Sequence, residues 1–172
     1  IGLARTQALI ENLKREIQLN GTEFTGGKTN IISVTDTRTL SATESGSTIY
    51  WTMGSAHNIT LPDAAVGLKY TFVIAVGAAA GHYIACQSAD RFFGKAVVLS
   101  TTDDQVGLQG QVIAASARKA LHIQSDIATT GGNAGDVITV EAIDGTYWRV
   151  TAELHTAHAN PSSIAVFKNA VP

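Results

Sequence analysis

Residues 137–151 read Val-Ile-Thr-Val-Glu-Ala-Ile-Asp-Gly-Thr-Tyr-Trp-Arg-Val-Thr, and this stretch decides the fold class. Apolar and polar residues alternate along both halves, which is the period of a half-buried β-strand. Asp144-Gly145 divides the two halves, and an Asp-Gly pair between two such segments predicts a β-hairpin. Trp148 follows the turn, and its ring is expected to fill the end of a hydrophobic core.

Outward from this hairpin, similar short segments recur along most of the chain. They are rich in β-branched and aromatic residues and are separated by turn residues at intervals of about 8–12 residues. This spacing predicts a mainly β chain of about ten strands, folded as an antiparallel sandwich or barrel-like domain. After an imperfect alternation at 31–42, the expected strands are 47–53, 57–61, 70–76, 82–87, 96–99, 121–125, 137–143, 147–151 and 164–167, with loops at 100–111 and 128–136.

The N-terminal segment has a different period. Leu3, Ile10 and Ile17 are spaced seven apart and Leu13 lies three beyond Ile10, so residues 3–19 are predicted to form an amphipathic helix with a short heptad pattern. Such a helix is only marginally stable alone in water. It therefore needs a partner, which is its own β domain, further copies of itself or another protein.

A hinge is expected between this helix and the strands. Asn20-Gly21 is a helix stop, and residues 22–30 contain Gly26-Gly27 among small polar residues that give little to bury. The predicted organisation is therefore an N-terminal arm, residues 1–30, followed by a β domain, residues 31–172.

Composition excludes several classes of protein. The chain has 172 residues, 45% hydrophobic and 15% charged, with a net charge of −2, so neither a disordered chain nor a nucleic-acid-binding protein is indicated. The longest apolar run, residues 72–80, is far shorter than the about 18 residues of a membrane span. Charged residues within the first twenty positions argue against a secretion signal, which predicts synthesis in the cytoplasm of a cell.

Motifs that carry chemistry are missing from the sequence. It contains no Gly-x-Ser-x-Gly elbow, no phosphate-binding Gly-Lys-Ser/Thr loop and no calcium loop. Asp103-Asp104 is interpreted as a solvated turn. Cys86 is the only cysteine, so it can form no intrachain disulfide, and it is expected to be a small buried residue. We expect neither enzyme activity nor a cofactor.

The five histidines are interpreted as structural. His155 and His158 are three apart and could chelate a metal together only on a helix, with no suitably spaced acid or cysteine beyond them. No metal site is therefore expected. His57, His82 and His122 stand at the starts of expected strands, where a solvent-facing edge position is expected for each.

Three segments carry a resemblance to a known family. Residues 39–50 (Thr-Leu-Ser-Ala-Thr-Glu-Ser-Gly-Ser-Thr-Ile-Tyr) are followed by 59–73 (Ile-Thr-Leu-Pro-Asp-Ala-Ala-Val-Gly-Leu-Lys-Tyr-Thr-Phe-Val) and later by 135–150, which contain the hairpin. Together they resemble the small β domains of tailed-bacteriophage virion proteins, especially head decoration (cement) proteins. Similar domains occur in tail-fibre proteins.

The resemblance implies a non-enzymatic role on the virion surface, with assembly as a homotrimer. The expected protein binds the major capsid protein from outside and bridges neighbouring capsomers, and it binds neither nucleic acid nor membrane. Its expected contact residues lie on the arm: Leu3, Arg5, Ile10, Leu13, Lys14, Arg15 and Ile17.

A second interpretation is a receptor-binding or tail-fibre domain that recognises a host-surface glycan. In that case Trp51, Tyr83 or a loop would hold the sugar. The interpretation of Trp51 and Trp148 as core residues competes with this one, because tryptophan is also the largest apolar side chain.

Overall fold

The structure is a computed structural model that describes residues 2–19, 29–55, 57–77, 82–102, 106–111, 122–125, 131–159 and 166–168. For residues 14–19, 106–111, 122–125 and 167–168 only the backbone is described. The expected hinge at 22–30 lies outside these ranges except for Thr29 and Asn30, and so does Asp103-Asp104.

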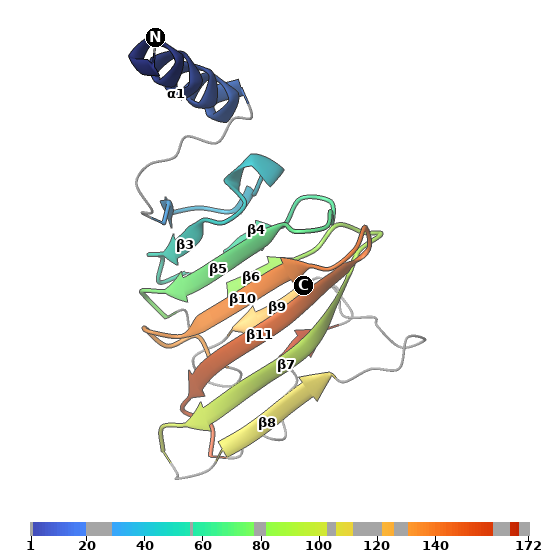
Figure 1. The fold of residues 1–172 in the computed structure, drawn as a ribbon. Coiled ribbons are helices and arrows are strands. Elements are labelled where there is room, and N and C mark those ends of the chain that lie inside the picture. Colours follow the sequence, from blue (N-terminus) through green and yellow to red (C-terminus); the bar gives the residue numbers. More distant parts are fainter. Residues whose placement is uncertain are drawn as a thin grey trace.

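The described residues are mainly in strands, with one helix at the N-terminus (Figure 1). The predicted helix is confirmed as α1 (Gly2–Leu19), and a short 3-10 helix, η1 (Ala42–Glu44), follows later. The strands are β1 (Ile31–Val34), β2 (Arg38–Thr39), β3 (Thr48–Trp51), β4 (Asn58–Thr60), β5 (Lys69–Ile74), β6 (His82–Ala85), β7 (Arg91–Ser100), β8 (Val106–Gln111), β9 (His122–Ser125), β10 (Val137–Ala142), β11 (Tyr147–Thr156) and β12 (Phe167–Lys168).

The strands form two sheets, and the chain crosses from one to the other after each of the first six strands. One sheet has seven strands in the order β1-β3-β5-β10-β11-β7-β8, and the other has five in the order β12-β9-β6-β4-β2. In the first, β1, β3 and β5 are parallel neighbours, and in the second β2, β4 and β6 are parallel neighbours. This part of the chain is therefore wound as a coil that adds one strand to each sheet per turn.

Register within the coil places similar side chains above one another. Ile32 pairs with Ile49, and Ile49 pairs with Phe72. On the other sheet Ile59 lies beside Ile84. Because apolar side chains stack along each sheet, every turn of the coil extends the same core.

The predicted hairpin is confirmed and lies between β5 and β7 (Figure 1). β10 is antiparallel to both β5 and β11, whereas β11 runs parallel to β7. The turn is closed by the Asp144 carboxylate, which accepts hydrogen bonds from the backbone N–H groups of Thr146 at 2.7 Å and Tyr147 at 2.8 Å. This is the local side-chain bonding that makes Asp a turn residue.

Two expectations about the strands are wrong. The domain is not antiparallel throughout, because half of the strand pairings between described residues are parallel. Regular spacing of strands suggested hairpins, but every connection between the first seven strands changes sheet instead. The expected loop at 100–111 also contains a strand, since β8 pairs antiparallel with β7.

Both sheets contribute to one hydrophobic core. Trp51 (1% exposed) and Trp148 (0%) are in it, together with Phe72 and Ile84. Trp148 donates from Nε1 to Oδ2 of the buried Asp90 at 3.4 Å, and the same oxygen accepts from Ala64 N at 2.9 Å. The expected packing of both tryptophans in the core is confirmed, so neither indole face is open to a sugar.

Cys86 is also part of this core, as expected. It is 7% exposed, and its thiol donates to the Asp90 carbonyl at 3.2 Å. Burial, with a smaller contribution from Asp90, raises the pKa of the Cys86 thiol to about 12. Thiolate is the reactive form, so Cys86 is chemically inert at neutral pH.

Candidate functional site

An apolar stripe on α1 is the most prominent exposed feature of the described residues. We call Leu3, Leu9, Ile10 and Leu13 the α1 stripe; their exposed fractions are 86%, 69%, 49% and 60%. With Thr6 and Asn12, the last three line a shallow groove on the helix surface. Isolated exposed leucines are ordinary, but a contiguous row along one helix marks an interaction surface.

The heptad positions explain why these side chains lie together. Leu3 and Ile10 are at a positions and Leu13 at a d position, so they share one face of the helix. Thr6 occupies the other d position, and its hydroxyl donates to the Gly2 carbonyl at 2.9 Å. Leu9, at the g position, widens the stripe. Sequence reasoning missed Leu9, although its place beside Ile10 was the available signal.

Nothing within the described part of the chain covers this stripe extensively, because no strand there packs closely along α1. The helix also has no acidic residue in its first turn and no basic residue in its last, so its dipole gains no support from charged side chains. At 18 residues it is about 27 Å long and marginal by itself. The helix therefore needs a partner.

The sequence-predicted contact residues are all on α1. Leu3, Arg5, Ile10 and Leu13 are exposed there. The positions of Lys14, Arg15 and Ile17 fall in the last part of the helix, where only the backbone is described.

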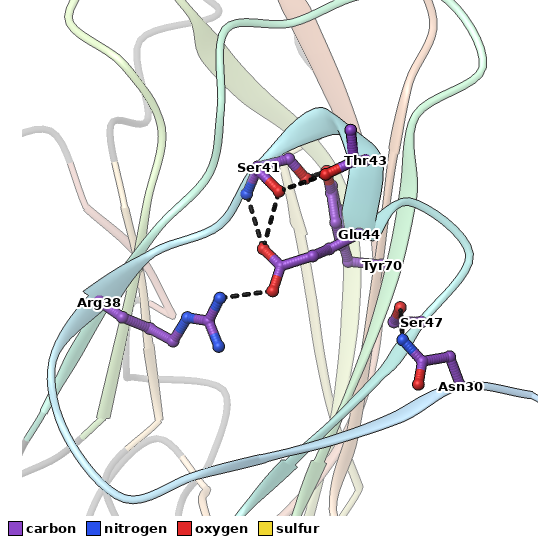
Figure 2. A network of polar contacts seen from close by, with 7 residues as sticks. All are labelled: Asn30, Arg38, Ser41, Thr43, Glu44, Ser47 and Tyr70. Carbon is purple, nitrogen blue, oxygen red and sulfur yellow. Dashed lines mark hydrogen bonds and ion pairs between the residues drawn. The ribbon is translucent and has the colours of Figure 1, made fainter. Parts of the chain in front are cut away.

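A polar network at the turn between β2 and β3 is the second candidate feature (Figure 2). Glu44 accepts hydrogen bonds at Oε2 from Ser41 N at 2.8 Å and from Ser41 Oγ at 3.1 Å, and its other oxygen forms an ion pair with Arg38. Tyr70, from β5, donates to the Ser41 carbonyl at 2.8 Å. The network thus connects β2 and the turn after it to β5.

Electrostatics in this network favour an ionised Glu44. Burial alone would raise the pKa of Glu44, but the bonds from Ser41 and the Arg38 guanidinium outweigh it and hold that pKa below its usual value. Burial, with the nearby Glu44 charge, raises the pKa of Tyr70 to about 12. Both groups therefore keep one protonation state at neutral pH, Glu44 ionised and Tyr70 neutral.

The buried Asp136 and the neighbouring His155 are the pair most similar to part of a catalytic centre. Nδ1 of His155 lies 2.7 Å from Oδ1 of Asp136, which is fully buried. A triad also needs a nucleophile at the other ring nitrogen. Among the described residues, no hydroxyl or thiol hydrogen-bonds Nε2 of His155. The Asp136 carboxylate instead accepts hydrogen bonds from backbone N–H groups, including that of His155.

The described residues contain no group of three or more His, Cys, Asp and Glu side chains placed to hold a metal ion. His155 lies near the end of β11 and His158 beyond it, not on a helix. No helix in the described part of the chain is long and apolar enough to cross a membrane.

Comparison with known proteins found no matching family model, no matching curated protein and no matching solved structure.

Proposed function

We propose that this protein is a non-enzymatic structural protein of a phage virion, which binds the outside of the capsid and stabilises it by bridging neighbouring capsomers. The observation that carries the proposal is the α1 stripe, an exposed apolar row on a helix that needs a partner. The resemblance of three sequence segments to decoration proteins indicates which partner this is, namely the major capsid protein. The role places the protein on the capsid surface after synthesis in the host cytoplasm.

The β domain in this proposal is a rigid body of two facing sheets, similar to a sandwich, that holds the contact surfaces in place. Its β2–β3 turn belongs to the segment that resembles the decoration proteins, and its Glu44 is held by Ser41 and Arg38. A chain with few charges and much small-residue surface suits extensive contact with other proteins, since charged residues are depleted at interface cores.

The α1 stripe supplies contact energy in this mechanism. Burying four such side chains contributes on the order of 6–10 kcal/mol before the costs of ordering the arm. Those costs remove much of it, so one arm binds weakly. Several arms in one homotrimer bind far more tightly, because each attached arm raises the effective concentration of the next.

A decoration assay tests the proposal with two matched variants of the full chain. Ile10→Asp places a charge in the stripe, and Ala8→Asp places the same charge at an f position on the opposite face of the helix. Added to particles that lack the protein, the Ala8→Asp variant should bind at the native number of copies and Ile10→Asp should not. Equal occupancy by both variants would show that the arm is not the anchor.

The number of copies on purified particles separates this proposal from the tail-fibre alternative. A decoration protein is present in many copies, close to the number of capsomer junctions, whereas a fibre domain is present in few. A low copy number would refute capsid decoration.

A further inference from the structure

Two histidines lie near the loop between β3 and β4, which comprises residues 52–57. His57 ends this loop and His82 begins β6, and the charge of His57 is close enough to His82 to lower the pKa of that imidazole. We call these two residues the histidine pair. Both were expected at solvent-facing edges, but His82 is only 1% exposed, so that expectation is wrong for His82.

His82 packs against an indole ring inside the core. Its ring centroid lies 4.3 Å from that of Trp51, with the two planes tilted by 33°. Nε2 lies 3.2 Å from the Val76 carbonyl oxygen, which fixes the neutral ring with its proton on Nε2. Nδ1 is buried and has no hydrogen-bond partner among the described residues, and Nε1 of Trp51 also has none.

His57, at the end of this loop, has polar partners of its own. Its Nε2 lies 3.0 Å from the Ser55 hydroxyl and its Nδ1 lies 3.4 Å from the Thr37 hydroxyl. Asp36 lies 3.7 Å away and is exposed. A charged His57 therefore keeps its partners, because the Thr37 hydroxyl can accept from Nδ1, the Ser55 hydroxyl can accept from Nε2, and the Asp36 carboxylate is within ion-pair distance.

A second proton on His82 meets a less favourable environment than one on His57. It would place a positive charge in the core, and Nδ1 has no hydrogen-bond partner among the described residues. Burial lowers the pKa of His82 most, the Val76 and Met53 backbones raise it, and His57 adds a further lowering. Among the described residues, His57 is the only titratable group that contributes to this pKa.

We propose that the histidine pair is an acid-sensitive latch, in which protonation of His82 breaks its packing against Trp51 and opens the indole to solvent. The proton comes from solvent and adds to Nδ1. The imidazolium then leaves its place against Trp51 to reach water. The proposal rests on the contacts of His82 alone and does not depend on the proposed virion role.

Trp51 fluorescence reports the opening directly. The chain has two tryptophans, so Trp148→Phe leaves Trp51 as the only indole. Quenching of this indole by acrylamide should increase by about threefold or more between pH 7.5 and pH 5, within the range in which an imidazole titrates. His82→Phe keeps a ring against Trp51 but cannot titrate, so its quenching should be independent of pH. A pH-dependent increase that persists in His82→Phe, or none in the parent, overturns the proposal.

His57→Asn is the matched control for the other member of the pair. It removes the like charge near His82, so the opening should persist and its midpoint should move to higher pH. Loss of the opening in His57→Asn would transfer the latch to His57 and refute the role of His82.

Hydrogen exchange on the unmodified chain keeps the test decisive if the tryptophan variant fails to fold. After correction for the intrinsic effect of pH, the backbone amides of Thr52, which donates to the Val34 carbonyl, and of Tyr83, which donates to the His57 carbonyl, should lose protection at pH 5, while those of β10 and β11 keep it. Unchanged protection at Thr52 and Tyr83 overturns the proposal.

Discussion

The carboxylate of Asp136 lies 2.7 Å from the Nδ1 atom of His155, at the point where the start of β10 meets the end of β11. The second carboxylate oxygen accepts from the backbone N–H groups of Gly132, Asn133 and His155 at 2.7, 3.1 and 2.9 Å. Asp136 is therefore a buried carboxyl group whose partners are mostly backbone N–H groups, and it fixes the loop of residues 131–136 against β11.

Asp136→Asn tests this role. The amide offers an N–H₂ group to backbone donors that need an acceptor, so we expect the free energy of unfolding to fall by about 2–4 kcal/mol. Chemical denaturation measures the change. His155→Gln removes a partly exposed partner and serves as the control, with an expected loss of at most about 1 kcal/mol. Equal effects of the two variants would contradict a backbone role for Asp136.

Gly94→Ala tests the parallel pairing of β7 with β11. Gly94 has a φ of +146°, and an added Cβ would lie 2.0 Å from the Val150 carbonyl oxygen, its register partner. We expect a loss of about 3 kcal/mol or more in the free energy of unfolding, or failure to fold. Gly145→Ala is the matched control, because its Cβ meets nothing closer than 3.9 Å. A well-tolerated Gly94→Ala would show that β7 and β11 do not pair in this register.

Glu44→Gln tests the network of the β2–β3 turn through its pH dependence. The pKa of Glu44 is lower in the folded chain than the ordinary 4.5, so its ionised form stabilises the fold above that value and this contribution disappears as the pH falls through the folded pKa. At pH 7 the variant should be less stable by about 0.5–1 kcal/mol, a figure reduced for partial solvent screening. Thermal unfolding at pH 7 and pH 3 measures both. A difference that does not shrink at pH 3 would contradict an electrostatic origin.

Light scattering on the free protein tests assembly through α1. The proposed homotrimer has about three times the chain mass of 18.0 kDa. Leu9→Glu and Ile10→Asp should each lower the measured mass, since both place a charge in the α1 stripe, while Ala8→Asp should leave it unchanged. A monomer at high concentration would contradict self-association of the free protein.

The helix and most strands could be predicted because local pattern determines them. Alternation marks β10 and β11, and the heptad spacing marks α1. Strand partners could not be predicted in the same way. The alternation of buried and exposed side chains along β3 is the same whether its neighbours run parallel or antiparallel to it. Successive turns of the coil also contain different numbers of residues, so the sequence shows no repeat of fixed length.

The site residues show the same limit. The stripe residues Leu3, Ile10 and Leu13 were predicted from spacing, which is local information. The burial of His82 depends on the Trp51 ring, which comes from a distant part of the sequence. Asp136 precedes a strand in a glycine-rich segment and has the composition of an ordinary loop residue. Only its contact with β11 reveals its role.

The coil formed by the first six strands also has a consequence for how such a domain can change in size. Each full turn gives every sheet one more parallel strand, so duplication or loss of a turn would lengthen or shorten both sheets without altering the remaining pairings, as in repeat proteins. On one side the β10–β11 hairpin prevents the addition of further turns. There β10 pairs antiparallel with β5, and the hairpin lies between β5 and β7. Growth by whole turns is therefore open only toward β1 and β2, the side of the chain that leads to α1.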